Sequence, residues 1–269
     1  MMIAYGHQLC HRGRNFLASP CCRNFLASPC GKTRGRGLEA KRQVVMATGG
    51  IEAVLFDMDG VLCNSEIVSR QAGAETMQAL YGIEVSPDEF IAFTGTGEAN
   101  FLGGVAKKHG VDDFDVDICK EKFFEIYLSK YAVPGSGIGY AGARELVQAC
   151  RETGLKTAVA SSADLVKVHA NLNAAEIPLT LFDAIVSADA FENLKPSPDI
   201  FLAAAKELGV TPDSCLVIED AIAGVQAARA ANMRVLAVAT TLSRESLGEI
   251  APDEIFSSIA EIGLKDICA

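Results

Sequence analysis

EAVLFDMDG, residues 52–60, joins a short apolar run to two aspartates that are one residue apart, Asp57 and Asp59. A continuous run of Ala, Val, Leu and Phe is typical of a strand buried on both faces of a parallel sheet. Side chains at positions i and i+2 of an extended segment point the same way, so the two carboxylates would share one small space. Close like charges are costly to desolvate, and we expect a cation or a shared proton to compensate them.

Four further apolar runs of four to six residues follow along the chain, and each ends in polar residues. They are KTAVASSAD (156–164), FDAIVSADA (182–190), SCLVIEDA (214–221) and MRVLAVAT (233–240). Helical segments separate them, and this alternation predicts a doubly wound, Rossmann-like α/β fold with a parallel sheet. Ligands of such folds bind beyond the carboxyl ends of the strands. The polar residues expected at those ends are Asp57, Ser161, Asp189, Glu219 and Asp220.

One connection is longer than the others. Roughly 95 residues lie between the first and second runs, where a βαβ unit uses roughly 30. Three segments of this stretch have helical spacing of apolar residues: 65–81, 89–109 with a GTG interruption, and 117–131. The long connection therefore predicts an inserted helical domain.

The predicted organisation is a core made of residues 51–63 and 136–269, with a helical cap of residues 64–135 inserted between them. The segments 63–65 and 134–139, the second of which reads PGSGIG, would connect the two parts. Paired linkers of this kind make a natural hinge.

Residues 1–46 differ from the rest of the chain in charge. They contain eight Lys or Arg and one acid, so they carry about +7, whereas the remainder carries about −17 and the whole chain −10. An Arg-rich, acid-poor leader without a continuous apolar core is typical of an organelle transit peptide, disordered in itself. RNFLASPC occurs twice in it, at 14–21 and 23–30. We expect import into the chloroplast stroma, with the mitochondrion as the alternative.

The acidic remainder argues against nucleic acid or an anionic membrane surface as a partner. No apolar run reaches the roughly 18–20 residues of a membrane span, so we expect no membrane insertion. Five cysteines lie outside the leader without CxxC spacing, which predicts reduced thiols. For Cys63, burial as a small apolar side chain is favoured over a redox role.

Four motifs stand in register with the predicted strand ends: DMDG, the serines of VASS, the lysine of LKPSPDIF and the acidic pair of VIEDAIAG. Each is weak alone, because a DxDG is usually a turn and an acidic pair at a strand end is usually a helix cap. In this order they resemble the haloacid dehalogenase (HAD) superfamily of aspartate-nucleophile phosphotransferases, over about residues 51–268. The helical cap inserted after the first motif resembles the β-phosphoglucomutase-like group of that superfamily.

Several stretches, among them FDMDGVLCNSE and FTGTGEANFLGG, are particularly similar to the HAD domain of a larger plant plastid protein involved in photoprotection. That protein also carries thioredoxin-like and propeller portions, which we do not expect in this chain. This likeness leaves open a regulatory HAD domain that acts by binding a partner, although every catalytic position is filled.

The resemblance assigns chemistry to the motifs. Asp57 would attack phosphorus and form an aspartyl phosphate, and Asp59 would act as general acid and then general base, which contributes roughly 10²–10⁴ in rate. Mg²⁺ would bind an Asp57 oxygen, the Asp59 backbone carbonyl and Asp220, with Glu219 as a weaker candidate.

Four residues are predicted to hold the phosphate: Ser161, Ser162, Lys195 and Gly60. The serines would donate hydrogen bonds to its oxygens, and the lysine would supply a fixed positive charge. The glycine would form a tight turn that lets backbone amides approach.

The choice among reactions rests on two places in the sequence. The dehalogenase branch works without metal and lacks the second acid, so Asp59 and Asp220 argue against it. A sugar-phosphate mutase grips a second phosphate with a cap arginine, and at the resembling place this chain has Glu98, which would repel one. Lys107, Lys108 or Lys122 could replace that arginine.

The cap residues Thr94, Gly95, Thr96 and Glu98 are expected to select the substrate. The predicted function is hydrolysis of a small phosphorylated metabolite by a magnesium-dependent phosphatase, with a mutase as the alternative. No residue indicates which metabolite is used, and protein partners are not indicated either.

Overall fold

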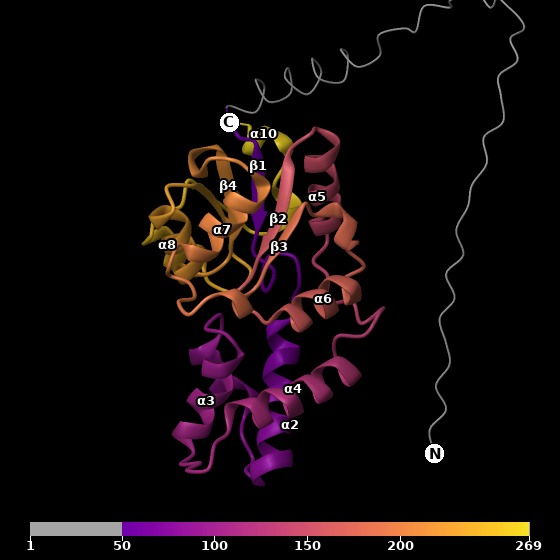
Figure 1. The fold of residues 1–269 in the computed structure, drawn as a ribbon, viewed down its shortest axis with the longest axis vertical. Helices are drawn as coiled ribbons and strands as arrows, with labels where there is room; N and C mark the ends of the chain where they lie inside the picture. Colours follow the sequence, from indigo (N-terminus) through magenta and orange to yellow (C-terminus); the bar gives the residue numbers. More distant parts are fainter. Residues whose placement is uncertain (1–49, 269) are drawn as a thin grey trace, which may run out of the picture.

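The computed structural model describes residues 50–268, and the predicted transit peptide lies outside these residues. A six-stranded parallel sheet forms the centre of the core, with strand order β3-β2-β1-β4-β5-β6 (Figure 1). The strands are β1 (Ala53–Phe56), β2 (Lys156–Ala160), β3 (Ala184–Val186), β4 (Cys215–Glu219), β5 (Arg234–Val238) and β6 (Glu254–Phe256). The predicted α/β fold with a parallel sheet is confirmed. The first motif follows the central strand.

Side chains of β1 alternate between the two faces of the sheet, as the strand period of two requires. Val54 and Phe56 join one apolar cluster with helices α5 (Ala143–Glu152) and α6 (Leu165–Ala174). Ala53 and Leu55 join the other, with α7 (Asp199–Leu208) and α8 (Ile222–Ala230). Both faces are therefore covered, which explains why each strand reads as a continuous apolar run. The short helices α9 (Arg244–Gly248) and α10 (Leu264–Ile267) complete the core.

The last strand, β6, was not among the predicted runs. It has three residues at the edge of the sheet, and its first residue, Glu254, is exposed. Only Phe256 is buried, so this strand has no apolar run of its own to find in the sequence.

The long connection between β1 and β2 folds as a helical insert below the sheet in Figure 1. It contains α2 (Glu66–Tyr81), the 3₁₀ segment η1 (Pro87–Phe93), α3 (Glu98–Lys108) and α4 (Val116–Lys130). These elements share an apolar cluster that includes Phe90, Phe101 and Phe123, and Ala174 of α6 joins it from the core. The predicted GTG interruption lies between η1 and α3, where Gly95 and Gly97 have positive φ.

The two segments that connect insert and core are hydrogen-bonded to each other. Asn64 N donates to the Ile138 carbonyl at 2.6 Å, and Tyr140 N donates to the Leu62 carbonyl at 3.0 Å. Cys63 lies between these bonds in an antiparallel bridge with Gly139. Entry to and exit from the insert are thus a single two-stranded connection, placed directly after the first motif.

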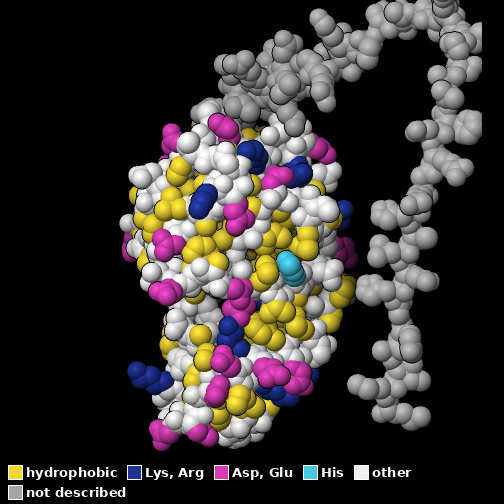
Figure 2. All heavy atoms as spheres, in the orientation of Figure 1, with side chains coloured by type: hydrophobic (Ala, Val, Ile, Leu, Met, Phe, Trp, Pro, Cys, Tyr) yellow, Lys and Arg dark blue, Asp and Glu magenta, His cyan; other side chains and the backbone are white. Residues whose placement is uncertain are grey.

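On the face drawn in Figure 2, Lys and Arg side chains are scattered among acidic and apolar ones.

Within residues 50–268, no helix is long and apolar enough to span a membrane. Cys63, Cys119, Cys150, Cys215 and Cys268 are free thiols, and all but Cys268 are buried.

Candidate active site

The strand order brings three of the four motifs together. β1 lies between β2 and β4, and Phe56 pairs with Val159 on one side and Ile218 on the other. The residues that follow these strands therefore meet at one edge of the sheet. Asp189 lies near the same edge but is used structurally, because its carboxylate accepts from Leu165 N at 2.7 Å and from Ser187 Oγ at 2.9 Å.

The two aspartates of the first motif do not share one partner. The chain turns directly after β1, and the Met58 carbonyl accepts from the amides of Leu62 and Cys63, both at 2.9 Å. Asp57 contacts Lys195, whereas Asp59 contacts Lys167. The strand ends at Phe56, so the segment is not extended through Asp59 as expected. Both side chains nevertheless line the same cavity, as expected, and each carboxylate has its own buried lysine.

Lys195 is enclosed by acceptors. Its Nζ lies 2.5 Å from Asp57 Oδ1, 2.9 Å from Glu219 Oε1 and 3.0 Å from the Ala160 carbonyl. Burial alone would lower the pKa of this ammonium group, but the two carboxylates outweigh it and raise the pKa. Lys195 is therefore a permanent positive charge beside Asp57, as its predicted role requires.

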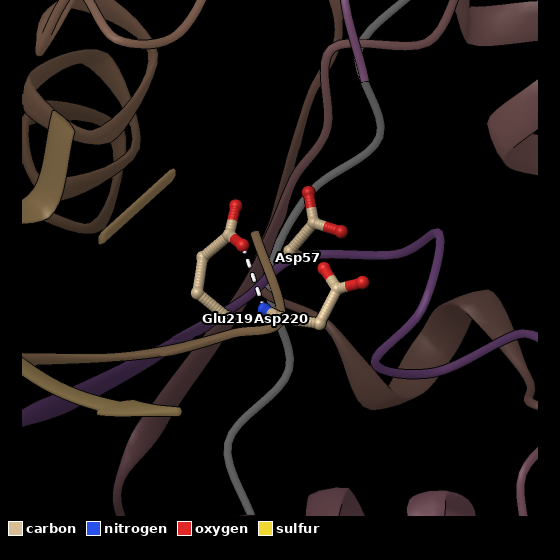
Figure 3. A group of neighbouring side chains, drawn as sticks. All are labelled: Asp57, Glu219 and Asp220. Atoms are coloured by element: carbon tan, nitrogen blue, oxygen red, sulfur yellow. Dashed lines mark hydrogen bonds between the residues drawn. The ribbon is translucent and has the colours of Figure 1, made fainter. Parts of the chain in front are cut away.

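A buried acidic cluster consists of Asp57, Glu219 and Asp220, and one carboxylate oxygen of each lies within 4.8 Å of one from each of the other two (Figure 3). Burial raises the pKa of Asp57 to about 8, opposed by Lys195 and reinforced by Glu219. Burial, Glu219 and Asp57 together raise the pKa of Asp220 well above its usual range. Further positive charge is needed before Asp57 and Asp220 can both ionise at neutral pH.

The oxygens of the cluster are not equally free. Glu219 Oε1 accepts from Lys195, and Oε2 accepts from the amides of Asp220 and Ala221 at 2.7 and 2.8 Å. In contrast, Asp220 Oδ2 is buried without a hydrogen-bond partner in the described part of the chain. An unpartnered buried carboxylate oxygen facing other carboxylates is the donor type that Mg²⁺ prefers. The residues present fit a hard cation, with Asp57 and Asp220 better placed than Glu219.

Gly60 lies in a turn, as expected, and has a further role beside Asp220. Its own amide donates to the Cys63 carbonyl at 2.8 Å, so this amide is not the one that would contact a phosphate. Its φ is +89°, and a Cβ at this position would lie 1.9 Å from Asp220 Oδ2. The absence of a side chain leaves room for the metal-facing carboxylate.

We expect Gly60→Ala to displace Asp220 and to strain the backbone. The positive φ alone costs about 1–3 kcal/mol, and the overlap with Asp220 Oδ2 adds to it. Urea unfolding should show a lower free energy of unfolding. In a Mg²⁺ titration of activity, the Mg²⁺ concentration needed for half-maximal activity should rise at least about tenfold. Gly209→Ala is the matched control, since Gly209 has φ +63° and no atom within 4 Å of the added Cβ. Equal effects of the two substitutions would show that Asp220 is not displaced.

Ser161 and Ser162 lie where the sequence predicted them, and both line the cavity. Ser161 Oγ accepts from Ala163 N at 3.2 Å, which leaves its hydroxyl hydrogen free to donate. Ser162 Oγ is buried without a partner among the described residues. Both hydroxyls can donate to an anionic ligand in the cavity.

The cavity has a volume of about 430 Å³ and lies between the carboxyl edge of the sheet and the helical insert. The predicted cap residues Thr94, Gly95, Thr96 and Glu98 all line it. Glu98, however, is only 4% exposed, and its Oε1 lies 3.4 Å from Lys167 Nζ. This pairing offsets the charge on which the repulsion argument rested, so that argument no longer separates a phosphatase from a mutase.

Three residues at or beside the cavity were missed by the sequence interpretation: Lys167, Asn171 and Arg70. Lys167 Nζ lies 3.0 Å from Asp59 Oδ2, and Asn171 Nδ2 donates to Asp59 Oδ1 at 3.2 Å. Arg70 lines the cavity from α2, with Nη1 3.2 Å from Asp88 Oδ1. Lys167 and Asn171 are four residues apart, which places them on one helix face, but no motif marks that face as the one toward Asp59.

Comparison with known proteins identifies the class. Residues 51–232 match the family described as haloacid dehalogenase-like hydrolase, and the chain belongs to that family.

Among curated proteins, the chain is 63% identical over 219 residues to Protein SUPPRESSOR OF QUENCHING 1, chloroplastic, of Arabidopsis thaliana, covering 81% of this chain and 21% of that protein. It is 29% identical over 213 residues to the Arabidopsis bifunctional riboflavin kinase/FMN phosphatase, covering 79% of this chain and 54% of that protein. It is 30% identical over 186 residues to fructose-1-phosphate phosphatase YqaB of Escherichia coli, covering 67% and 92%. The chain thus spans about a fifth and about half of the first two relatives.

Two solved structures share the fold at similar identity. One is a mutant of CbbY from Rhodobacter sphaeroides in complex with xylulose-(1,5)bisphosphate, with TM-score 0.69 and 27% identity over 79% of this chain and 96% of that one. The other is β-phosphoglucomutase from Clostridium difficile, with TM-score 0.69 and 26% identity over 81% and 95%.

Proposed function

We propose that this protein is a magnesium-dependent phosphatase that hydrolyses a small phosphorylated metabolite through an aspartyl phosphate on Asp57. The observation that carries the proposal is the buried group formed by Asp57, Lys195 and Asp220. It combines a carboxylate nucleophile, a fixed ammonium charge 2.5 Å away and an unpartnered carboxylate oxygen suited to a cation. The family match and the phosphatases among the relatives support this reaction class.

In the first step, the Asp57 carboxylate forms a bond to phosphorus as the ester P–O bond breaks. Asp59 gives its proton to the departing alkoxide oxygen. Lys195, Ser161 and Ser162 offset the charge on the transferring oxygens, because they are positioned before the reaction begins. In the second step, Asp59 takes a proton from water, which attacks phosphorus and releases inorganic phosphate from Asp57.

Asp57 and Asp220 would hold the Mg²⁺, with Glu219 restricted to anchoring Lys195. Bound Mg²⁺ supplies positive charge that neutralises phosphate oxygens and favours the ionised form of the nucleophile. We also propose that the helical insert, residues 64–135, is a cap whose loop at Thr94–Thr96 contacts the non-reacting end of the substrate, whereas the buried Glu98 is held by Lys167.

Removal of the metal is expected to abolish activity and to lower stability. A ligand at 100 times its dissociation constant stabilises the folded state by about 2.7 kcal/mol, which corresponds to about 5–10 °C in Tm for a chain of this size. Thermal unfolding with EDTA and with Mg²⁺ measures this shift in the wild-type chain and in Asp220→Asn. A Tm of the variant that rises with Mg²⁺ as much as that of the wild type would contradict the role of Asp220.

The test of the function is a hydrolysis screen of the full chain with Mg²⁺ against a broad panel of phosphorylated sugars, polyols and small acids, compared with Asp57→Asn. Release of phosphate by the wild type alone is expected. Equal inactivity of both proteins would favour the second candidate, a regulatory domain that acts by binding a partner. The 63% identity to part of SUPPRESSOR OF QUENCHING 1 is the observation that favours this second candidate.

A third candidate is a sugar-phosphate mutase, for which the paired Glu98 is no longer an obstacle. Conversion of a sugar phosphate into its isomer without release of phosphate would identify it. We further propose the chloroplast stroma as the location, because the basic leader accompanies a strong likeness to a chloroplastic protein.

A further inference from the structure

Two chains of contacts lead from Asp59 across α6 into the helical insert. In the first, Lys167 Nζ lies 3.0 Å from Asp59 Oδ2 and 3.4 Å from Glu98 Oε1 on α3. In the second, Asn171 Nδ2 donates to Asp59 Oδ1 at 3.2 Å, and Tyr127 of α4 donates to Asn171 Oδ1 at 2.7 Å. Asp59 is therefore tied to the insert twice, each time through one side chain of α6.

Both chains are shielded from water. Glu98 and Lys167 are 4% and 7% exposed, and Asn171 and Tyr127 are fully buried. Buried ion pairs and hydrogen bonds are costly to break, because the partner left behind is neither solvated nor paired. Glu98 is fixed further, since its Oε2 accepts from Asp164 N at 3.1 Å.

A third contact fixes Asp59 from the hinge side. Ser65 immediately precedes α2, and its hydroxyl donates to Asp59 Oδ1. Lys167, Asn171 and Ser65 together contact both oxygens of the Asp59 carboxyl group. Two of these three residues lie on α6 and hold their positions through side chains of the insert.

We propose that Lys167 and Asn171 are positioning residues that hold the carboxyl group of Asp59 for proton transfer, and that Glu98 and Tyr127 of the insert hold them in turn. This inference rests on the proposed function, because it takes Asp59 as the acid that protonates the leaving group. It assigns Glu98 and Tyr127 to the proton-transfer step instead of to substrate selection or folding alone. The position of the insert relative to the core then controls how efficiently Asp59 protonates the leaving group.

The experiment compares esters that differ in how much they need the acid. An alkyl phosphate expels a strongly basic alkoxide and needs the proton from Asp59, whereas p-nitrophenyl phosphate expels a weakly basic phenolate that leaves without it. Because kcat/KM reports the phosphorylation of Asp57, its value for each ester reports the step in which the proton is given. The alkyl ester is the best substrate found in the screen described above.

The full chain is assayed with Mg²⁺. In both Glu98→Gln and Tyr127→Phe, the fall in kcat/KM should be at least about tenfold greater for the alkyl ester than for p-nitrophenyl phosphate. This difference is part of the roughly 10²–10⁴-fold rate enhancement that a general acid contributes. Retained activity on p-nitrophenyl phosphate shows that the variants fold. The double variant Glu98→Gln with Lys167→Met should lose little more than Lys167→Met alone, because Glu98 acts through Lys167.

Matched controls exist within the insert itself. Glu75 accepts from Lys130 and from Tyr131, whose hydroxyl lies 2.7 Å from Glu75 Oε1, and this group does not reach Asp59. Glu75→Gln and Tyr131→Phe make the same chemical changes and should lower kcat/KM for both esters equally or not at all.

Equal losses on both esters in Glu98→Gln and Tyr127→Phe would overturn this inference alone. A wild-type chain that hydrolyses neither ester nor any member of the panel would remove the proposed function, and this inference with it.

Discussion

Asp57→Asn should lower kcat/KM at least about 10⁴-fold on every substrate that the wild-type chain hydrolyses, because the amide cannot form the covalent bond to phosphorus. The fold should survive. The amide occupies nearly the same volume, and Lys195 keeps Glu219 as a partner at 2.9 Å. Replacing one of three crowded buried carboxylates with a neutral group also removes repulsion within the cluster. We therefore expect the Tm without metal to be equal to or higher than that of the wild type.

The measurement combines steady-state hydrolysis with detection of the intermediate. Beryllium fluoride, which mimics a phosphoryl group on a carboxylate, should stabilise the wild type against thermal unfolding in the presence of Mg²⁺ and leave Asp57→Asn unchanged. Asp213→Asn is the control, because Asp213 is exposed and lies before β4, at the opposite edge of the sheet. Residual hydrolysis by Asp57→Asn within tenfold of the wild type would rule out Asp57 as the nucleophile.

Lys195→Met should have the largest effect on stability. It removes the ammonium group between Asp57 and Glu219, and the apolar side chain leaves two buried carboxylates without their shared cation. Breaking a buried pair in this way costs about 3–5 kcal/mol, or about 6–20 °C in Tm. Activity should be lost as well, since the fixed charge beside the nucleophile is gone.

The source of this destabilisation can be tested separately. Adding Asp57→Asn to Lys195→Met removes one of the two buried carboxylates that lack a cation, so the Tm of the double variant should be higher than that of Lys195→Met. If Lys195→Met only created a packing defect, the second substitution would not raise the Tm. Lys206→Met on the exposed side of α7 makes the same change in solvent and should alter the unfolding free energy by no more than about 0.5 kcal/mol. A Tm of Lys195→Met equal to that of this control would contradict the assigned pairing.

Local pattern was sufficient for much of the fold. The five apolar runs became β1 to β5 because a strand buried on both faces must be apolar throughout, and that requirement is visible in the sequence. The edge strand β6 escaped because Phe256 is its only buried residue. In the insert, the break between η1 and α3 was visible because glycines at 95 and 97 mark positions of positive φ.

The candidate site divides along a similar line. Asp57, Ser161, Lys195 and Asp220 were predictable because each directly follows or accompanies a recognisable motif at a strand end. Lys167 and Asn171 were not, because a lysine and an asparagine on a helix usually face solvent, and only the packing of α6 against Asp59 gives them partners. The roles of Gly60 and Glu98 were also judged from their neighbours in sequence, whereas their nearest partners, Asp220 and Lys167, are far away along the chain.

By itself, the sequence determined the order of the strands along the chain, the position of the helical insert and the four motifs that meet at one edge of the sheet. These properties depend on the alternation of apolar and polar residues and on short-range spacing. Only the tertiary structure decided which cation each carboxylate meets: Lys195 for Asp57, and Lys167 for both Asp59 and Glu98. The physical reason is that a buried charge is satisfied by whichever opposite charge the packing brings within about 3 Å. Local sequence pattern does not determine which distant segments pack together.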